Sequence, residues 1–197
     1  MKKYILLLLA VVTIGMVACD VETYTDPEGT EVELMTGEWT VTFEQSLDEY
    51  YALFYGEADP ELTSMTADEL DSVTWADVYG TGKVSVYTYN TSSNSTDSLW
   101  FADYAADADD ATFWQYKVKL PIDADEYTFS CETTANTSYD GCDITILGGK
   151  IMEDAATTPR GYAADSIVAY VYFSDDYYGF TYMKMSGYRY TGFDEDK

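Results

Sequence analysis

The stretch Trp39-Thr-Val-Thr-Phe43 alternates apolar and polar side chains with a period of two, which is typical of a strand that buries one face. The longer stretch Phe113-Trp-Gln-Tyr-Lys-Val-Lys-Leu120 repeats this alternation, and we expect Pro121 to end that strand. Together these stretches predict a sheet with one apolar face, which makes the fold class all-β.

Further strand-like runs separated by turns fill the chain after Lys83. They are Val84–Tyr89, Ser98–Phe101, Tyr127–Cys131, Cys142–Leu147, Lys150–Met152, Ser166–Phe173, Phe180–Met185 and Tyr188–Phe193. About 8–10 short strands at hairpin spacing predict an antiparallel barrel or sandwich. Residues 46–80 break the pattern as an acidic insertion, in which Thr66-Ala-Asp-Glu69 ahead of Leu70 matches a capping box and predicts one short helix.

The N-terminus has the pattern of an export signal. Residues 1–3 are cationic, residues 4–17 are an apolar run, and Ala18 is followed by Cys19. This resembles the bacterial lipobox, in which the cysteine becomes the lipidated N-terminus, although Met16 stands where Leu is usual. The alternative is an ordinary signal peptide that is cleaved near Ala18 and leaves Cys19 free.

This pattern divides the chain into a lipoprotein signal peptide (1–18), an acidic tether (19–35) and a single β-barrel domain (36–197). We therefore expect a lipid-anchored protein of a bacterial cell envelope. The outer membrane is the expected location, although Asp20 directly after the cysteine favours inner-membrane retention in some bacteria.

Two further cysteines, Cys131 and Cys142, flank a turn-rich segment between two predicted strands. Export would bring them into an oxidising compartment, so we expect a disulfide between them. Two buried free thiols are the alternative.

Composition restricts the chemistry. The 197 residues contain 36 Asp and Glu against 10 Lys and Arg, a formal net charge of -26 that disfavours nucleic-acid partners. The absence of His excludes Ser-His-Asp and Cys-His catalysis and His-ligated zinc. We expect no metal and no cofactor. The acidic runs 107–110 and 123–126 leave open a calcium loop, and the many carboxylates leave open a carboxylate-based hydrolase.

Gly37-Glu-Trp39 at the first strand and Arg189 in the last strand resemble a pattern of the lipocalin and calycin proteins. In those proteins a Trp plugs one end of an up-and-down barrel and a late Arg packs over it. An Arg guanidinium over an indole ring combines cation–π attraction with closure of the barrel floor. We therefore expect Trp39 and Arg189 to meet at one end of an up-and-down barrel.

A broader resemblance is carried by short motifs over about residues 36 to 193. The motifs are Gly37-Glu-Trp-Thr-Val-Thr42, Tyr87-Thr-Tyr-Asn-Thr91, Asp97-Ser-Leu-Trp100, Phe113-Trp-Gln-Tyr-Lys-Val-Lys119, Gly149-Lys-Ile151, Asp165-Ser-Ile167, Phe173-Ser-Asp-Asp176 and Ser186-Gly-Tyr-Arg-Tyr-Thr-Gly-Phe193. They look like the Bacteroidetes lipoproteins labelled "lipid-binding putative hydrolase". That resemblance implies a calycin-like antiparallel barrel and a lipid-like ligand, but no catalytic residue can be transferred from it.

Two functions compete. The first is non-enzymatic binding of a lipid-like or small hydrophobic ligand inside the barrel, lined by the inward faces of the two stretches quoted at the start. The expected lining residues are Trp39, Val41, Phe43, Trp114, Tyr116 and Val118. The alternative is a surface glycan-binding module, in which exposed Tyr and Trp side chains stack on sugar rings.

Overall fold

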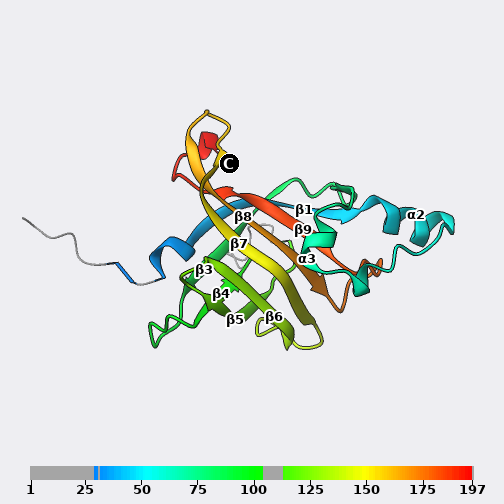
Figure 1. Cartoon of the computed structure of the whole chain (residues 1–197), viewed down its shortest axis with the longest axis horizontal. Helices are drawn as coiled ribbons and strands as arrows, with labels where there is room; N and C mark the ends of the chain where they lie inside the picture. Colours follow the sequence, from blue (N-terminus) through cyan, green and yellow to red (C-terminus); the bar gives the residue numbers. More distant parts are fainter. Residues whose placement is uncertain (1–28, 31, 104–112, 197) are drawn as a thin grey trace, which may run out of the picture.

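The computed structural model describes residues 29–30, 32–103 and 113–196. In this part of the chain nine strands form one antiparallel sheet, in the order β2-β1-β3-β4-β5-β6-β7-β8-β9 (Figure 1). The strands are β1 (Gly37–Ser46), β2 (Trp75–Ala76), β3 (Lys83–Asn90), β4 (Ser98–Ala102), β5 (Lys117–Asp123), β6 (Thr128–Ala135), β7 (Asp143–Thr157), β8 (Ala163–Phe173) and β9 (Met183–Arg189).

The sheet closes on itself because β1 and β9 also pair, from Trp39 opposite Arg189 to Gln45 opposite Met183. Eight strands thus form an up-and-down barrel, and the short β2 is an additional strand at one end. The expected all-β, calycin-like barrel is confirmed. We call the end that contains Gly37 and Arg189 the base, and the opposite end, where β1 finishes, the rim.

Several predicted strand boundaries were wrong. Gly148 adopts a left-handed backbone with φ of 58°, so the runs predicted on either side of it join through a bulge into β7. The two runs at the C-terminal end likewise form the single strand β9. Strand β5 starts only at Lys117, because Gln115 has a positive φ of 56° that interrupts the extended chain.

Pro121 lies within β5 and does not end it. The next residue, Ile122, donates its N–H to Asp97 beside β4. Successive amides of a strand point to opposite sides, so the ring nitrogen of Pro121 faces β6. The pairing of β5 with β6 covers only Ile122 and Asp123, so proline removes no ladder hydrogen bond at this position.

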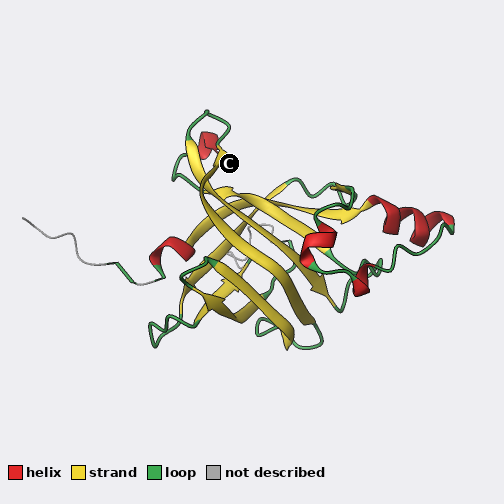
Figure 2. Ribbon diagram, viewed as in Figure 1, coloured by secondary structure: helices red, strands yellow, loops and turns green. Residues whose placement is uncertain are grey.

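The insertion contains two α-helices where one was predicted (Figure 2). The predicted helix is α3 (Ala67–Leu70), and the capping box between Thr66 and Glu69 is present. The additional helix, α2 (Leu47–Tyr55), is capped by the Ser46 hydroxyl, which accepts a hydrogen bond from the Glu49 amide, and it ends at Gly56 in a left-handed conformation. A 3-10 turn, η2 (Leu62–Ser64), lies between the two helices, and another, η3 (Asp194–Asp196), follows β9 near the C-terminus.

The barrel domain begins before residue 36. A 3-10 turn, η1 (Glu33–Met35), lies at the base, and both Val32 and Met35 are buried there. The last residues of the segment expected as a tether are therefore part of the folded domain. Among the described residues, none of the helices combines the length and the apolar character that crossing a membrane requires.

Candidate functional site

The base of the barrel contains the expected contact between the first and last strands. The Arg189 guanidinium lies over the Trp39 ring, 4.4 Å from its centroid. Arg189 Nε also forms an ion pair of 2.9 Å with Asp165, and its terminal nitrogens donate to the carbonyl oxygens of Thr36 and Leu34. The opposite edge of the indole is fixed as well, because Trp39 Nε1 donates to the Thr88 hydroxyl at 2.8 Å. This arrangement closes the base.

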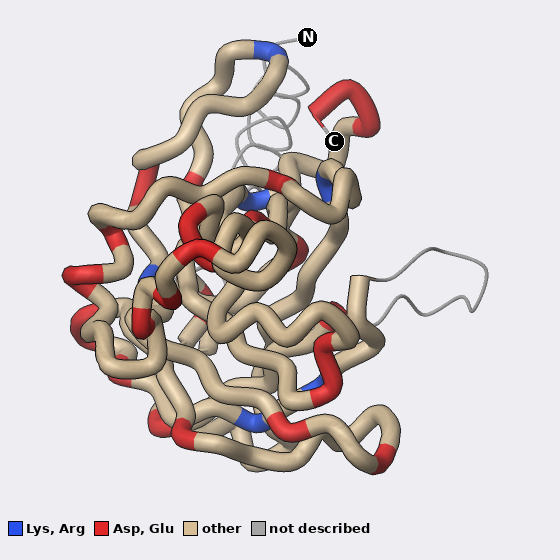
Figure 3. The backbone as a smooth tube through the Cα atoms, turned by 90° about the vertical axis from the view of Figure 1, so that its right-hand side faces the viewer, with Lys and Arg blue, Asp and Glu red and all other residues tan. Residues whose placement is uncertain are grey.

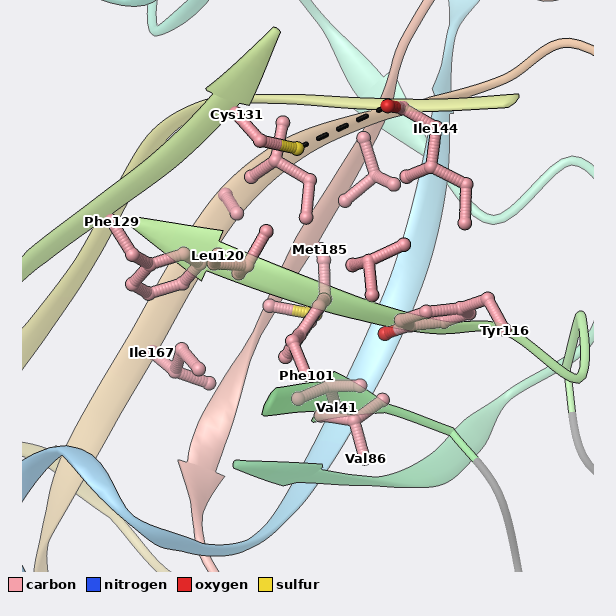
Figure 4. Close-up of a cluster of buried hydrophobic side chains, with 14 of the residues drawn as sticks. Val41, Val86, Phe101, Tyr116, Leu120, Phe129, Cys131, Ile144, Ile167 and Met185 are labelled. Carbon is pink, nitrogen blue, oxygen red and sulfur yellow. Dashed lines mark hydrogen bonds between the residues drawn. The ribbon is translucent and has the colours of Figure 1, made fainter. Parts of the chain in front are cut away.

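Side chains fill the interior of the barrel (Figure 4). Five of the six side chains that were expected to line an internal ligand site are fully buried in this core: Trp39, Val41, Phe43, Tyr116 and Val118. They are brought together, but they pack against one another and against residues of every barrel strand. The hydroxyl of Tyr116 has no hydrogen-bond partner among the described residues. Burial raises the pKa of Tyr116 well above its usual value, so this hydroxyl keeps its proton.

The sixth residue, Trp114, lies at the rim. Its indole stacks on Phe173 at 4.5 Å between centroids and donates from Nε1 to Asp175 at 2.8 Å. It lines a shallow hollow of about 550 Å³ together with Phe113 and Tyr139. The six residues therefore do not enclose one cavity.

Carboxylates organise the rest of the rim. Asp103 is only 1% exposed and accepts hydrogen bonds from the backbone N–H groups of Trp114, Gln115 and Tyr116. Burial raises the pKa of Asp103, although these three donors act in the opposite direction. Asp176 accepts from the Tyr79 hydroxyl at 2.7 Å. These acidic groups are therefore acceptors within the fold.

The expected disulfide is absent, and this prediction was wrong: Cys131 and Cys142 are buried free thiols. Strand register explains the result. Cys131 pairs with Ile146, whereas the carbonyl of Cys142 accepts from the Asn136 amide. Four residues along β7 separate Ile146 from Cys142, or about 13 Å at the usual strand rise. A disulfide needs Cα atoms within about 7 Å.

The structure also contains a groove of about 890 Å³. It crosses the outer face of β5 to β9, and α3 forms one wall. The apolar side chains on its floor are Met152, Val168 and Tyr170, and the groove also borders Ile122, Phe129 and Ile167, whose side chains pack in or against the barrel core. Tyr170 is held in place because its hydroxyl donates to Asp71, next to α3, at 2.5 Å.

The sequence pattern did not predict this groove. It depends on α3, which belongs to the insertion, and on the bulge at Gly148, where an added Cβ would collide with Ala67 of α3. One signal was available: Met152 and Val168 are apolar residues on strand faces that otherwise carry polar side chains. Such residues on an outer face indicate a surface that is covered or occupied.

A second surface feature is the aromatic character of α2, which projects beyond the rim (Figure 1). Its buried residue is the charged Glu49, whereas Tyr51, Phe54 and Tyr55 are exposed. Nearby, Tyr177 is 91% exposed and packs edge-on against Tyr178. This exposed group is the feature that a glycan-binding module would require.

The remaining predicted sites are the lipidation site at Cys19 and the two acidic runs. Cys19 and the acidic run 107–110 fall outside the described residues. In the run 123–126, an oxygen of Asp123 accepts from the amides of Asp125 and Glu126, as in an ordinary turn. Among the described residues no three Cys, Asp or Glu side chains are grouped so as to hold a metal ion.

The chain matches a known protein family. A family model described as "Lipid-binding putative hydrolase" matches residues 24–194 of the chain. This range covers the whole barrel, the insertion and the base. No curated protein matches the sequence.

Proposed function

Because this chain belongs to the "Lipid-binding putative hydrolase" family, we propose that it binds a lipid-like molecule without transforming it, as a lipid-anchored protein of a bacterial cell envelope. The family and the barrel support lipid binding. The site, the absence of catalysis and the anchor are parts of the proposal, and each has its own support and its own test.

The groove on the outer face of β5 to β9 carries the proposal for the site. Its volume of 890 Å³ is within the range of about 300–1,000 Å³ that is usual for small-molecule sites. The barrel interior is already filled by its own side chains, so a ligand there would have to displace them. An acyl chain on the groove floor would instead cover Met152 and Val168, which otherwise face water.

The proposed lack of catalysis rests on the titratable groups. The chain has no His, and the buried carboxylates Asp103 and Glu49 accept hydrogen bonds from backbone amides. We expect no turnover of fluorogenic acyl esters above the rate in buffer. Turnover that is retained through purification and abolished by a single substitution in the groove would contradict this part of the proposal.

Lipid binding can be tested by native mass spectrometry of the purified chain after exposure to a total lipid extract. We expect a bound adduct, and Val168→Trp should abolish it because an indole would fill the groove floor. Thr133→Trp is the matched control, since Thr133 is exposed on the outer face of β6 away from the groove. Equal binding by both variants would exclude the groove as the site.

Anchoring through Cys19 is supported by the lipobox-like sequence at residues 16–19. Metabolic labelling with a palmitate analogue should label the protein. Cys19→Ala should lose the label and leave the protein in the soluble fraction of the envelope. Label retained by that variant would contradict the proposed anchor.

The exposed aromatic residues of α2 favour glycan binding as a second candidate function. Tyr51 and Tyr55 have their ring centroids 5.7 Å apart and are both exposed, so they could offer faces to a sugar chain. Affinity electrophoresis in gels containing polysaccharides should then show retardation that Tyr51→Ala and Tyr55→Ala remove. Unchanged mobility on every polysaccharide tried would leave lipid binding as the sole candidate.

A further inference from the structure

Basic residues are far fewer than acidic residues in this protein (Figure 3). Most of the basic side chains in the described part of the chain have partners. Lys83 donates to the Tyr188 hydroxyl, Lys117 lies 4.7 Å from the Trp100 ring centroid, and Arg160 contacts two aromatic rings. Arg189 closes the base. Hydrogen bonds from Ser95 and Ser98 lower the pKa of Asp97, and the charge of Lys119 adds to that effect.

Two lysines are exceptions. Within the described part of the chain, neither Lys150 nor Lys184 has a hydrogen bond, an ion pair or a ring contact, and both line the groove. The chain offers 36 acidic side chains as possible partners for its 10 bases. Two unpaired ammonium groups in one hollow of such a protein indicate a site for an anion that the chain itself does not supply.

Strand register brings these lysines toward a common point. Lys150 on β7 is opposite Val168 on β8, and Val168 is opposite Ser186 on β9. Lys184 is opposite Tyr170, two residues further along β8. The two lysine Cα atoms are therefore about 10 Å apart across the strands and about 7 Å along them. Their flexible four-carbon stems can bring both ammonium groups onto one anion above Val168.

The groove also contains a buried polar atom without a partner. The Ser166 Oγ has no hydrogen-bond partner among the described residues. Ser166 precedes Val168 on the same outward face of β8, so its hydroxyl adjoins the apolar floor. A buried hydroxyl that lacks a partner costs free energy unless a ligand or water satisfies it.

The acidic residues of the groove do not occupy the same position. Asp71 accepts from Tyr170, and Asp123 accepts from two backbone amides in its own turn. Asp68 is exposed on α3. None of these carboxylates forms an ion pair with Lys150 or Lys184 in the described part of the chain, so both ammonium groups remain available to a ligand.

We propose that the groove binds a phosphate-bearing lipid, in which Lys150 and Lys184 hold the phosphate, Ser166 donates a hydrogen bond to it, and an acyl chain lies along Met152 and Val168. This inference rests on the proposed lipid-binding function and specifies the headgroup. Because the protein as a whole is strongly acidic, recognition depends on the local pair of lysines, and single lipid molecules are better ligands than a charged bilayer surface.

The test compares three soluble probes by isothermal titration calorimetry on the full-length chain: dihexanoyl phosphatidylglycerol, dihexanoylglycerol and inorganic phosphate. We expect phosphatidylglycerol to bind most tightly. The double variant Lys150→Gln/Lys184→Gln should weaken its binding at least tenfold and leave dihexanoylglycerol unaffected. Ser166→Ala should weaken phosphatidylglycerol binding by a smaller factor. The control Lys83→Gln/Lys119→Gln changes the net charge equally and should bind as the unmodified chain does.

Other outcomes would contradict either the headgroup inference or the proposed function. Equal binding of the two lipids, with no effect of the groove lysines, would overturn the headgroup inference while lipid binding stands. Inorganic phosphate binding as tightly as phosphatidylglycerol would show a free-anion site and would also overturn it. If neither lipid binds the unmodified chain, the proposed function itself fails. An equal loss in the control variant would attribute the effect to net charge and would reject the role of the two lysines.

Discussion

The two ends of the barrel are closed by opposite kinds of charge. At the base, the cation Arg189 contacts the Trp39 ring, pairs with Asp165 and donates to two backbone carbonyls. At the rim, carboxylates accept from backbone amides and from aromatic side chains, as Asp103 and Asp175 do. An acidic chain thus supplies many carboxylate acceptors for the rim, whereas one cationic side chain, Arg189, is central to the closure of the opposite end.

The difference predicts that the ends respond differently to pH. A guanidinium group is not deprotonated in proteins, so we expect the cation–π contact at the base to be independent of pH. The rim depends on carboxylates and should respond to pH. Burial acts against ionisation of Asp175, but hydrogen bonds from Cys142, Trp114 and Tyr139 prevail and lower its pKa, whereas burial raises the pKa of Asp103 and of Glu49. Lowering the pH therefore weakens the hydrogen bonds that Asp175 accepts, and it removes the cost of burying a charge at Asp103 and Glu49.

Breaking the rim at Asp103 should have the largest effect. Asp103→Ala leaves three backbone N–H groups without their acceptor, and each buried unsatisfied group costs about 1–3 kcal/mol. We expect a loss of about 4 kcal/mol in the free energy of unfolding, measured by urea denaturation. Asp125→Ala, an exposed change of the same kind, should cost less than about 0.5 kcal/mol. Similar losses for the two variants would show that Asp103 does not organise the rim.

Breaking the base at Arg189 should have the next largest effect. Arg189→Ala removes the cation–π contact, the ion pair and two donors to carbonyl oxygens, and we expect a loss of about 2–3 kcal/mol. Arg189→Lys should recover only a minor part, because an ammonium group cannot make these contacts together. The loss should be the same at pH 5 and pH 8. A strong dependence on pH would contradict the contrast between the two ends.

A third variant tests the direction in which the fold shifts the pKa of Glu49, a carboxyl group near the rim. One oxygen of Glu49 accepts from the Thr181 amide at 2.8 Å, and the other is buried without a partner among the described residues. Burial raises the folded-state pKa of Glu49 above its ordinary value of 4.5. The stabilisation from its protonated form is therefore complete below 4.5 and is lost as the pH rises through the folded-state pKa.

Glu49→Gln should consequently be more stable than the unmodified chain at pH 7, by about 1 kcal/mol, and equal to it near pH 4. Melting temperatures over this pH range would measure the difference. Asp48→Asn alters the exposed neighbour on α2 and should bring no gain at pH 7. A gain for Glu49→Gln that is largest at pH 4 would refute the assigned direction of the pKa.

The sequence predicted the features that depend on alternation and on chain order. The alternating pattern from Trp39 to Phe43 gave the first strand, and the neighbourhood of first and last strands in an up-and-down barrel gave the contact of Trp39 with Arg189. The capping box at Thr66 and Glu69 was also local, so it too could be predicted.

Features set by long-range register could not be predicted. The groove requires Lys150 and Lys184 to share a face, which follows only when the bulge at Gly148 shifts the register of β7 against β8. Helix α2 was missed for another reason: it exposes aromatic residues and buries Glu49, which inverts the pattern by which a surface helix is recognised.

The smallest expected effect concerns the cysteines and sharpens the description of the rim. Cys142 lies near Asp175, and burial together with that carboxylate raises the pKa of its thiol to about 11. A thiol with such a pKa is almost entirely protonated at neutral pH, so it oxidises slowly.

In a Cys19→Ala background, dithiothreitol should therefore leave the melting temperature unchanged, and unfolded protein prepared without reductant should react with two equivalents of a thiol reagent. A disulfide would instead contribute about 2–4 kcal/mol, and its reduction would lower the melting temperature by several degrees. Such a drop would require Cys131 and Cys142 to approach each other by several ångströms, and the register of β6 with β7 would have to change with them.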